Sequence, residues 1–199
     1  HTLMVGSNGT GKTICQELIA LSFVRKGYRA WLFVKADDVT RIIRAYRDVL
    51  YINPADSECD LKLNLLRMLS KETFVTLFKG AFFLADGSEG YLLQSLGELQ
   101  RRNPDANLAD LYHFIKARKH TLHLREQGWQ DSILNRTGGL LESPLGKLFD
   151  CARGHEESIQ RHNVIFNIEG LTLPQQKFLV GSLIKVLYSG NMQSGRCTY

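Results

Sequence analysis

Residues 6–13, Gly-Ser-Asn-Gly-Thr-Gly-Lys-Thr, decide the fold of this 199-residue chain. They meet the pattern G-x-x-x-x-G-K-[ST], in which glycines let the backbone curl until successive N–H groups point at phosphate oxygens. A helix that begins at the end of such a loop adds the partial positive charge of its N-terminus. The lysine then reaches the β- and γ-phosphates, and the threonine hydroxyl binds magnesium. We therefore predict a site for ATP and Mg²⁺ formed by Gly6, Ser7, Asn8, Gly9, Thr10, Gly11, Lys12 and Thr13, with Thr13 as the metal ligand.

The residues around this loop have the spacing of a βαβ unit. Residues 2–5 form a short apolar run, and residues 12–26 place apolar side chains at steps of three and four, as in a helix. Gly27 follows two basic residues and predicts the end of that helix. Residues 30–34 are continuously apolar, as expected of a parallel strand that is covered on both faces. The chain therefore belongs to the α/β class, with a mostly parallel sheet and flanking helices.

In the rest of the chain, the spacing of apolar residues changes from strand-like to helical and back again. Residues 49–52 and 164–168 predict further strands, and Thr172, with Gln175 three residues later, predicts the start of a last helix. Between these strands the apolar residues follow helical spacing. We therefore predict an ATPase core interrupted by an inserted all-α subdomain: residues 1–56 form the first part of the core, 57–160 the insertion and 161–199 the continued, truncated core.

Three local features of the predicted insertion can be predicted. Asn107 is a suitable N-cap for a helix. Gly138-Gly139 predicts a break between helices. The phenylalanines of the first long helix are interpreted as core packing and not as a stacking platform: Phe74, Phe78, Phe82 and Phe83.

Composition sets limits on partners and location. The net charge of +5 permits a polyanionic partner such as DNA but does not require one, and no long basic run locates a nucleic-acid surface. The four cysteines form no C-x-x-C pair, so we expect reduced thiols and no structural metal. No signal peptide or bilayer-length apolar run is present, and we expect a cytoplasmic protein. The chain lacks an initiating Met, and we interpret it as a piece of a longer protein.

The loop and three further stretches carry a family resemblance. The base-reading N-K-x-D motif of Ras-like GTPases and the signature of ABC ATPases are absent. Residues 1–13 instead resemble the P-loop of the HerA/FtsK superfamily, which includes the conjugative coupling proteins and related type IV secretion ATPases. Residues 28–38, 53–66 and 144–149 followed by 164–171 are also similar to this group. The resemblance departs at Lys35-Ala36, where many members have an aspartate-proline step.

This resemblance implies a RecA-like ATPase domain that works as a DNA translocase. Members form rings, usually hexamers, that couple ATP hydrolysis to the movement of DNA through the centre. It implies DNA and other copies of the same chain as partners, with any membrane contact made by parts outside this chain, in the cytoplasm or at the inner face of the membrane. Lys12 is then a catalytic residue that stabilises the transferred phosphoryl group.

The catalytic acid of such an ATPase is not evident in the chain. By family order the Walker B strand follows residue 199, and this piece is then incomplete for catalysis. In a competing interpretation residues 164–169 are the Walker B strand and Glu169 polarises water, although Asn167 occupies the place of the usual magnesium-binding aspartate. Two other functions remain open: a nucleotide-gated assembly or binding module without turnover, and a metabolic P-loop kinase.

Overall fold

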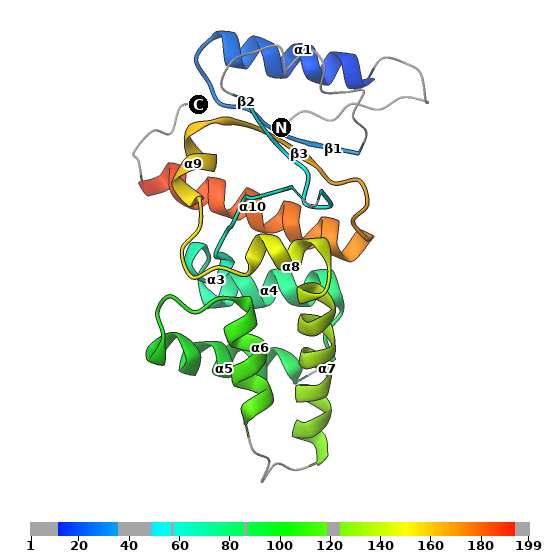
Figure 1. Cartoon of the computed structure of the whole chain (residues 1–199), viewed down its shortest axis with the longest axis vertical. Helices are drawn as coiled ribbons and strands as arrows, with labels where there is room; N and C mark the ends of the chain where they lie inside the picture. Colours follow the sequence, from blue (N-terminus) through cyan, green and yellow to red (C-terminus); the bar gives the residue numbers. More distant parts are fainter. Residues whose placement is uncertain (1–11, 36–48, 57, 86, 119–123, 194–199) are drawn as a thin grey trace. The chain divides into compact units, whose positions relative to one another are not determined.

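The computed structural model describes residues 12–35, 49–56, 58–85, 87–118 and 124–193; for residues 12, 13, 156–158 and 189–193 it describes the backbone alone. Contacts divide the chain into two compact units (Figure 1). The first, which we call the sheet unit, comprises residues 1–53 and 157–169. The second, the helical unit, comprises residues 54–156 and 170–199.

Within the described residues, the sheet unit is built on three parallel strands and the first helix. The strands lie in the order β1-β3-β2, so the last strand in sequence occupies the centre. Val164 of β3 is paired with Trp31 on one side and with Leu50 on the other. The first helix and the strands predicted near residues 30–34, 49–52 and 164–168 are confirmed, with these bounds: α1 Lys12–Arg25, β1 Trp31–Val34, β2 Val49–Ile52 and β3 Asn163–Asn167. The strand predicted at residues 2–5 lies outside the described residues.

One face of α1 covers this sheet. Ala20 and Leu21 are consecutive residues of α1, and both are buried. They belong to one apolar cluster with side chains of β1 and β3, namely Leu32, Val34 and Ile165. The continuous apolar runs of the strands are thus explained by burial, as is usual for parallel sheets.

The predicted helix end at Gly27 is also confirmed. Gly27 has a φ of 82°, which its lack of a Cβ permits at little cost. Its N–H donates to Val24 O at 2.9 Å, and the N–H of Tyr28 donates to Phe23 O at 3.0 Å. This pair of bonds is a Schellman motif, which satisfies the last carbonyls of α1. The turn sends the chain back along the helix into β1.

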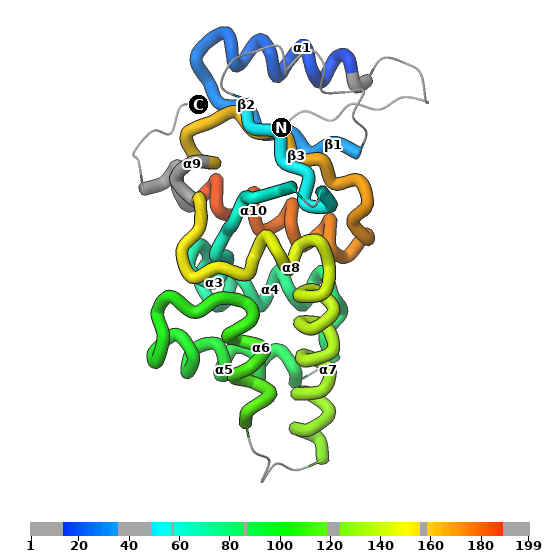
Figure 2. The backbone as a smooth tube through the Cα atoms, viewed as in Figure 1, coloured from blue at the N-terminus to red at the C-terminus, as the bar shows by residue number. Residues whose placement is uncertain are grey.

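Figure 2 follows the backbone of both units. Among the helices of the described residues, α1 and nearly all of α9, Glu156–Arg161, belong to the sheet unit, and the others belong to the helical unit. Its helices are α3 Leu65–Met68, α4 Lys71–Phe82, α5 Ser88–Arg102, α6 Leu108–Ala117, α7 Leu124–Leu141, α8 Pro144–Phe149 and α10 Leu173–Gln193. The helix α10 packs along α4 and so clusters with this unit. The domain boundaries predicted from the sequence stay a prediction.

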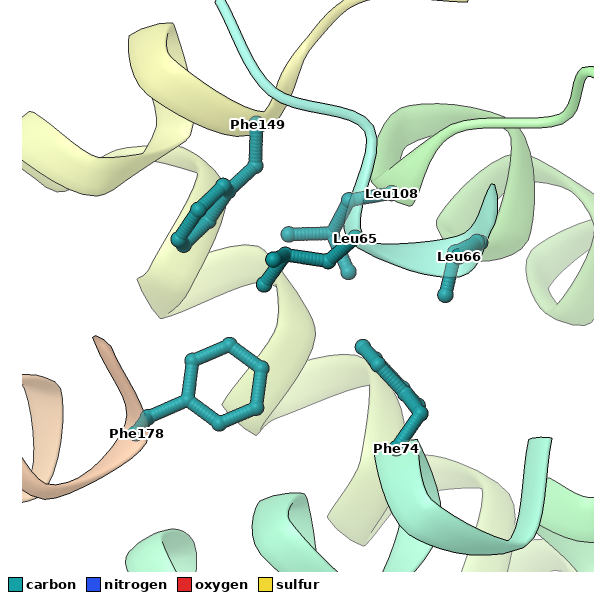
Figure 3. A pocket seen from close by; sticks show the side chains of 6 residues that line it. All are labelled: Leu65, Leu66, Phe74, Leu108, Phe149 and Phe178. Carbon is teal, nitrogen blue, oxygen red and sulfur yellow. The ribbon is translucent and has the colours of Figure 1, made fainter. Parts of the chain in front are cut away.

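Aromatic rings form the centre of the helical unit. Phe178 of α10 meets Phe74 and Phe78 of α4 edge-on, with ring centroids 5.8 and 5.7 Å apart. Figure 3 shows the surrounding junction, where the space between the side chains is too small for a water molecule. The junction is therefore packed core and not a ligand pocket. It is lined by Leu65, Leu66, Phe74, Leu108, Phe149 and Phe178.

The local predictions for this unit had mixed outcomes. Asn107 caps α6 in a reciprocal capping box with Asp110, as its sequence position indicated. The prediction that Phe83 is core is wrong: this left-handed C-cap residue of α4 is 72% exposed. The predicted break at Gly138-Gly139 is also wrong, because α7 continues through it. A Cβ on Gly138 would approach the Tyr112 ring of α6 to 3.4 Å, so the glycine permits close packing of two helices.

Candidate functional site

The three parallel strands end at one edge of the sheet, which we call the carboxyl edge. Val34 O accepts a hydrogen bond from Ile168 N at 2.7 Å, so β1 and β3 end at the same level. Because the Gly27 turn reverses the chain, α1 runs against β1 and begins toward this edge (Figure 1). Ligands of open parallel sheets bind outside the carboxyl ends of their strands. We therefore expect a ligand-binding site at the carboxyl edge.

The predicted phosphate loop directly precedes α1 in the sequence. Lys12 is the first residue of α1, so the helix begins within the G-K-T triplet of the motif. The first turn of α1 contains no acidic residue that would repel an anion. The loop residues Gly6, Ser7, Asn8, Gly9, Thr10 and Gly11 lie outside the described residues, as do the side chains of Lys12 and Thr13. Their roles stay a prediction.

Asn167 closes the carboxyl end of the central strand. Its side chain is buried, with 3% of its surface exposed. Its Nδ2 donates to Tyr51 Oη of β2 at 3.0 Å, and its Oδ1 accepts from the N–H of Glu169 at 2.9 Å. The amide therefore holds two strands together and fixes the turn that follows β3. A neutral amide also supplies less charge to a divalent cation than a carboxylate would.

Glu169 itself stands in the turn after β3 and is exposed. Gly170 follows it with a φ of 79°, which completes the turn. The structure thus places Glu169 at the carboxyl edge, toward which α1 begins. Its predicted role in polarising water stays a prediction.

The structure describes only part of the stretch at which the sequence departs from the family pattern. Lys35 follows β1 directly and is exposed at the carboxyl edge. Asp37 and Asp38, which come just after it in the sequence, lie outside the described residues.

Sequence reasoning missed a buried carboxyl group on α1. Glu17 is only 4% exposed and lies on the same helix face as Ala20 and Leu21, which cover the sheet. Its Oε1 has no hydrogen-bond partner in the described structure. Burial raises the pKa of the Glu17 carboxyl above its ordinary value. The signal in the sequence was helical spacing. Glu17 stands three residues before Ala20 and four before Leu21, which places it on the same apolar face.

Two features are absent from the described residues. No group of three His, Cys, Asp or Glu side chains in this part of the chain is arranged to hold a metal ion. Among the helices in the described ranges, none has the length and apolarity needed to cross a membrane.

A small parallel sheet with a helix that begins toward its carboxyl edge, together with a helical unit, is a fold similar to that of two solved structures. VirB4 of Thermoanaerobacter pseudethanolicus matches 96% of this chain and 56% of its own, with a TM-score of 0.59 and 14% sequence identity. The bacterial conjugative coupling protein TrwBdeltaN70 matches 94% of this chain and 50% of its own, with a TM-score of 0.57 and 12% identity.

These matches confirm the predicted fold class and the structural resemblance. The chain spans about half the length of the two solved structures. At 12–14% identity the similarity concerns the fold alone. No family model and no curated protein matches the chain.

Proposed function

We propose that this chain is the ATP-binding part of a motor domain that hydrolyses ATP to move DNA. The observation that carries the proposal is the start of α1 at Lys12, inside the G-x-x-x-x-G-K-T motif. A helix that starts at this point leaves its first N–H groups without partners inside the helix. Those groups, with the N-terminal end of the helix dipole, favour the binding of phosphate.

The donor set of the loop fits a triphosphate with magnesium. Gly6 and Gly11 permit the curled backbone, Lys12 supplies a mobile cation, and Thr13 supplies a hydroxyl for the metal. Bound Mg²⁺ would neutralise charge on the β- and γ-phosphates during phosphoryl transfer. The chain's own contribution is to grip and orient the triphosphate. We propose that the acid that activates water, and an arginine from a neighbouring subunit, complete the site in a homohexameric ring.

The first test is Lys12→Ala. We expect it to weaken binding of ATP with Mg²⁺ to this chain by at least about 100-fold and to abolish ATP hydrolysis by the protein. The matched control is Lys185→Ala, which removes an exposed lysine from α10. Binding is measured by isothermal titration calorimetry, hydrolysis by phosphate release, and folding by circular dichroism. Unchanged hydrolysis in folded Lys12→Ala protein would refute the proposal.

A second candidate is a nucleotide-gated assembly module that binds ATP without turnover. Asn167 supports it, because a neutral amide at the end of β3 supplies no negative charge for magnesium. In that case ATP promotes self-association, measured by analytical ultracentrifugation, and no phosphate is released. DNA-stimulated phosphate release would exclude this candidate and favour the motor.

A further inference from the structure

We infer that the edge of the sheet unit opposite the phosphate site binds single-stranded nucleic acid. The strands β1 and β3 begin at this edge, which we call the amino edge. Two segments far apart in the sequence meet here, joined by residues 131 positions apart: residues 23–29, the end of α1 and the turn after it, and residues 160–162, the end of α9 and the residue after it. The inference does not depend on nucleotide binding at the other edge.

Hydrogen bonds hold the two segments together. Asn163 Oδ1 accepts from the N–H of Ala30 at 2.9 Å, and Val164 N donates to Ala30 O at 3.0 Å. The guanidinium of Arg29 donates through Nη1 to the carbonyl of Gln160. The register of β1 on β3 therefore fixes which basic residues become neighbours, a juxtaposition that separate segments of the sequence do not reveal.

Both segments at the amino edge carry positively charged side chains. Segment 23–29 has the sequence Phe-Val-Arg-Lys-Gly-Tyr-Arg, and segment 160–162 has the sequence Gln-Arg-His. Neither segment contains an acidic residue. All four of their lysine and arginine side chains are exposed: Arg25, Lys26, Arg29 and Arg161. A cluster of one sign attracts polyanions and draws its binding energy from released counterions.

Two aromatic rings lie among these cations. Phe23 is 50% exposed and Tyr28 is 45% exposed, and their centroids are 5.9 Å apart in an edge-to-face pair. The contact belongs to the Schellman turn, so the backbone holds both rings in place. Rigid, exposed aromatic faces among cations stack with unpaired bases, which a duplex does not offer. This feature favours a single-stranded nucleic acid over an acidic peptide, which has no bases to stack.

The test measures binding of a fluorescein-labelled 20-mer single-stranded oligonucleotide by anisotropy, without ATP, across a salt series. The charge variant is Lys26→Gln with Arg29→Gln, and its control is Arg136→Gln with Lys185→Gln, two exposed cations of the helical unit. We expect the charge variant to raise the Kd about tenfold and to lower the slope of log K against log salt by about 1.4, the value for two lost contacts to a single strand. We expect the control to change neither quantity appreciably.

A second variant separates stacking from charge. Tyr28→Leu keeps an apolar contact with Phe23 but removes a π-face, so we expect weaker binding by about fivefold or more with an unchanged salt slope. Lys12→Ala should bind the oligonucleotide normally, which keeps this test independent of the proposed ATPase. Circular dichroism verifies that each variant folds.

Several results would overturn the inference. One is an equal loss of affinity in the charge variant and its control. Others are tighter binding of a duplex of the same length, equal competition by poly-glutamate, or binding of anionic phospholipid vesicles in place of the oligonucleotide.

Discussion

Asn167 Nδ2 donates a hydrogen bond to Tyr51 Oη at 3.0 Å, which joins the central strand β3 to β2 at the carboxyl edge. The Oδ1 of the same side chain accepts a hydrogen bond from the N–H of Glu169. One buried side chain thus fixes both the strand end and the turn that carries Glu169. The arrangement explains the amide at this position without assigning it a metal, and it bears directly on the role of Glu169.

We expect Glu169→Gln to change ATP hydrolysis by less than about threefold. The reason is that Asn167, two residues earlier, supplies no negative charge for magnesium, and the catalytic acid is then expected elsewhere. Steady-state phosphate release by the protein, alongside Lys12→Ala, measures this. A loss of 100-fold or more with retained ATP binding would instead identify Glu169 as the residue that activates water.

Asn64 is expected to be among the most sensitive positions of the helical unit. It is fully buried, and its Nδ2 donates to the carbonyls of Ala106 and Ala152 at 3.1 and 2.9 Å. Its Oδ1 caps α3 by accepting from Leu66 N and Arg67 N. Loss of the cap and of several buried bonds should lower the free energy of unfolding of Asn64→Ala by about 3–5 kcal/mol.

Chemical denaturation checks this value. Asn135→Ala, at an exposed position of α7, is the matched control and should change stability by less than about 0.5 kcal/mol. Asn64→Asp keeps the capping oxygen but loses both donors, so it should be no more stable than Asn64→Ala. A cost below about 1 kcal/mol for Asn64→Ala would contradict the bonding described.

Gly146 and Gly139 should respond in opposite directions to alanine. A Cβ at Gly146 in α8 would lie 1.8 Å from the carbonyl oxygen of Leu141, so the backbone has to move. Nothing lies within 4 Å of a Cβ at Gly139 inside α7. We expect Gly146→Ala to lose at least about 3 kcal/mol and Gly139→Ala to gain about 0.5–1 kcal/mol, from the higher helix propensity of alanine. If thermal unfolding gives both variants a higher Tm than the parent protein, or both a lower Tm, the prediction is contradicted.

Glu17 should make stability fall as the pH rises. Its pKa is raised in the folded state, so the folded protein retains the proton more readily than the unfolded chain. Its favourable contribution is complete below the ordinary pKa of 4.5 and is lost as the pH rises through the higher folded value. Glu17→Gln removes this dependence and should flatten the stability profile between about pH 4.5 and 7.

Denaturant midpoints at several pH values measure the effect of Glu17→Gln. Glu142→Gln, at the exposed end of the long helix α7, provides a control with the same chemical change. If both variants keep the parent protein's dependence of stability on pH, Glu17 is solvated and not buried in the folded protein.

The sequence determined the features that depend on neighbours along the chain. The strands of residues 31–34 and 49–52 followed from apolar runs, the end of α1 from Gly27, and the cap of α6 from Asn107. The predicted fold class also followed, because a phosphate-loop motif between a strand and a helix has few structural solutions. These features rest on local chemistry, which residues within one or two turns supply.

The tertiary structure alone decided which distant segments meet. It placed β3 between β1 and β2, grouped α10 with α4, and buried Glu17. It also carried α7 through Gly138-Gly139 and left Phe83 exposed, against the local pattern. In each case the outcome depends on surfaces contributed by residues far away in the sequence, and periodicity along the chain carries no information about them.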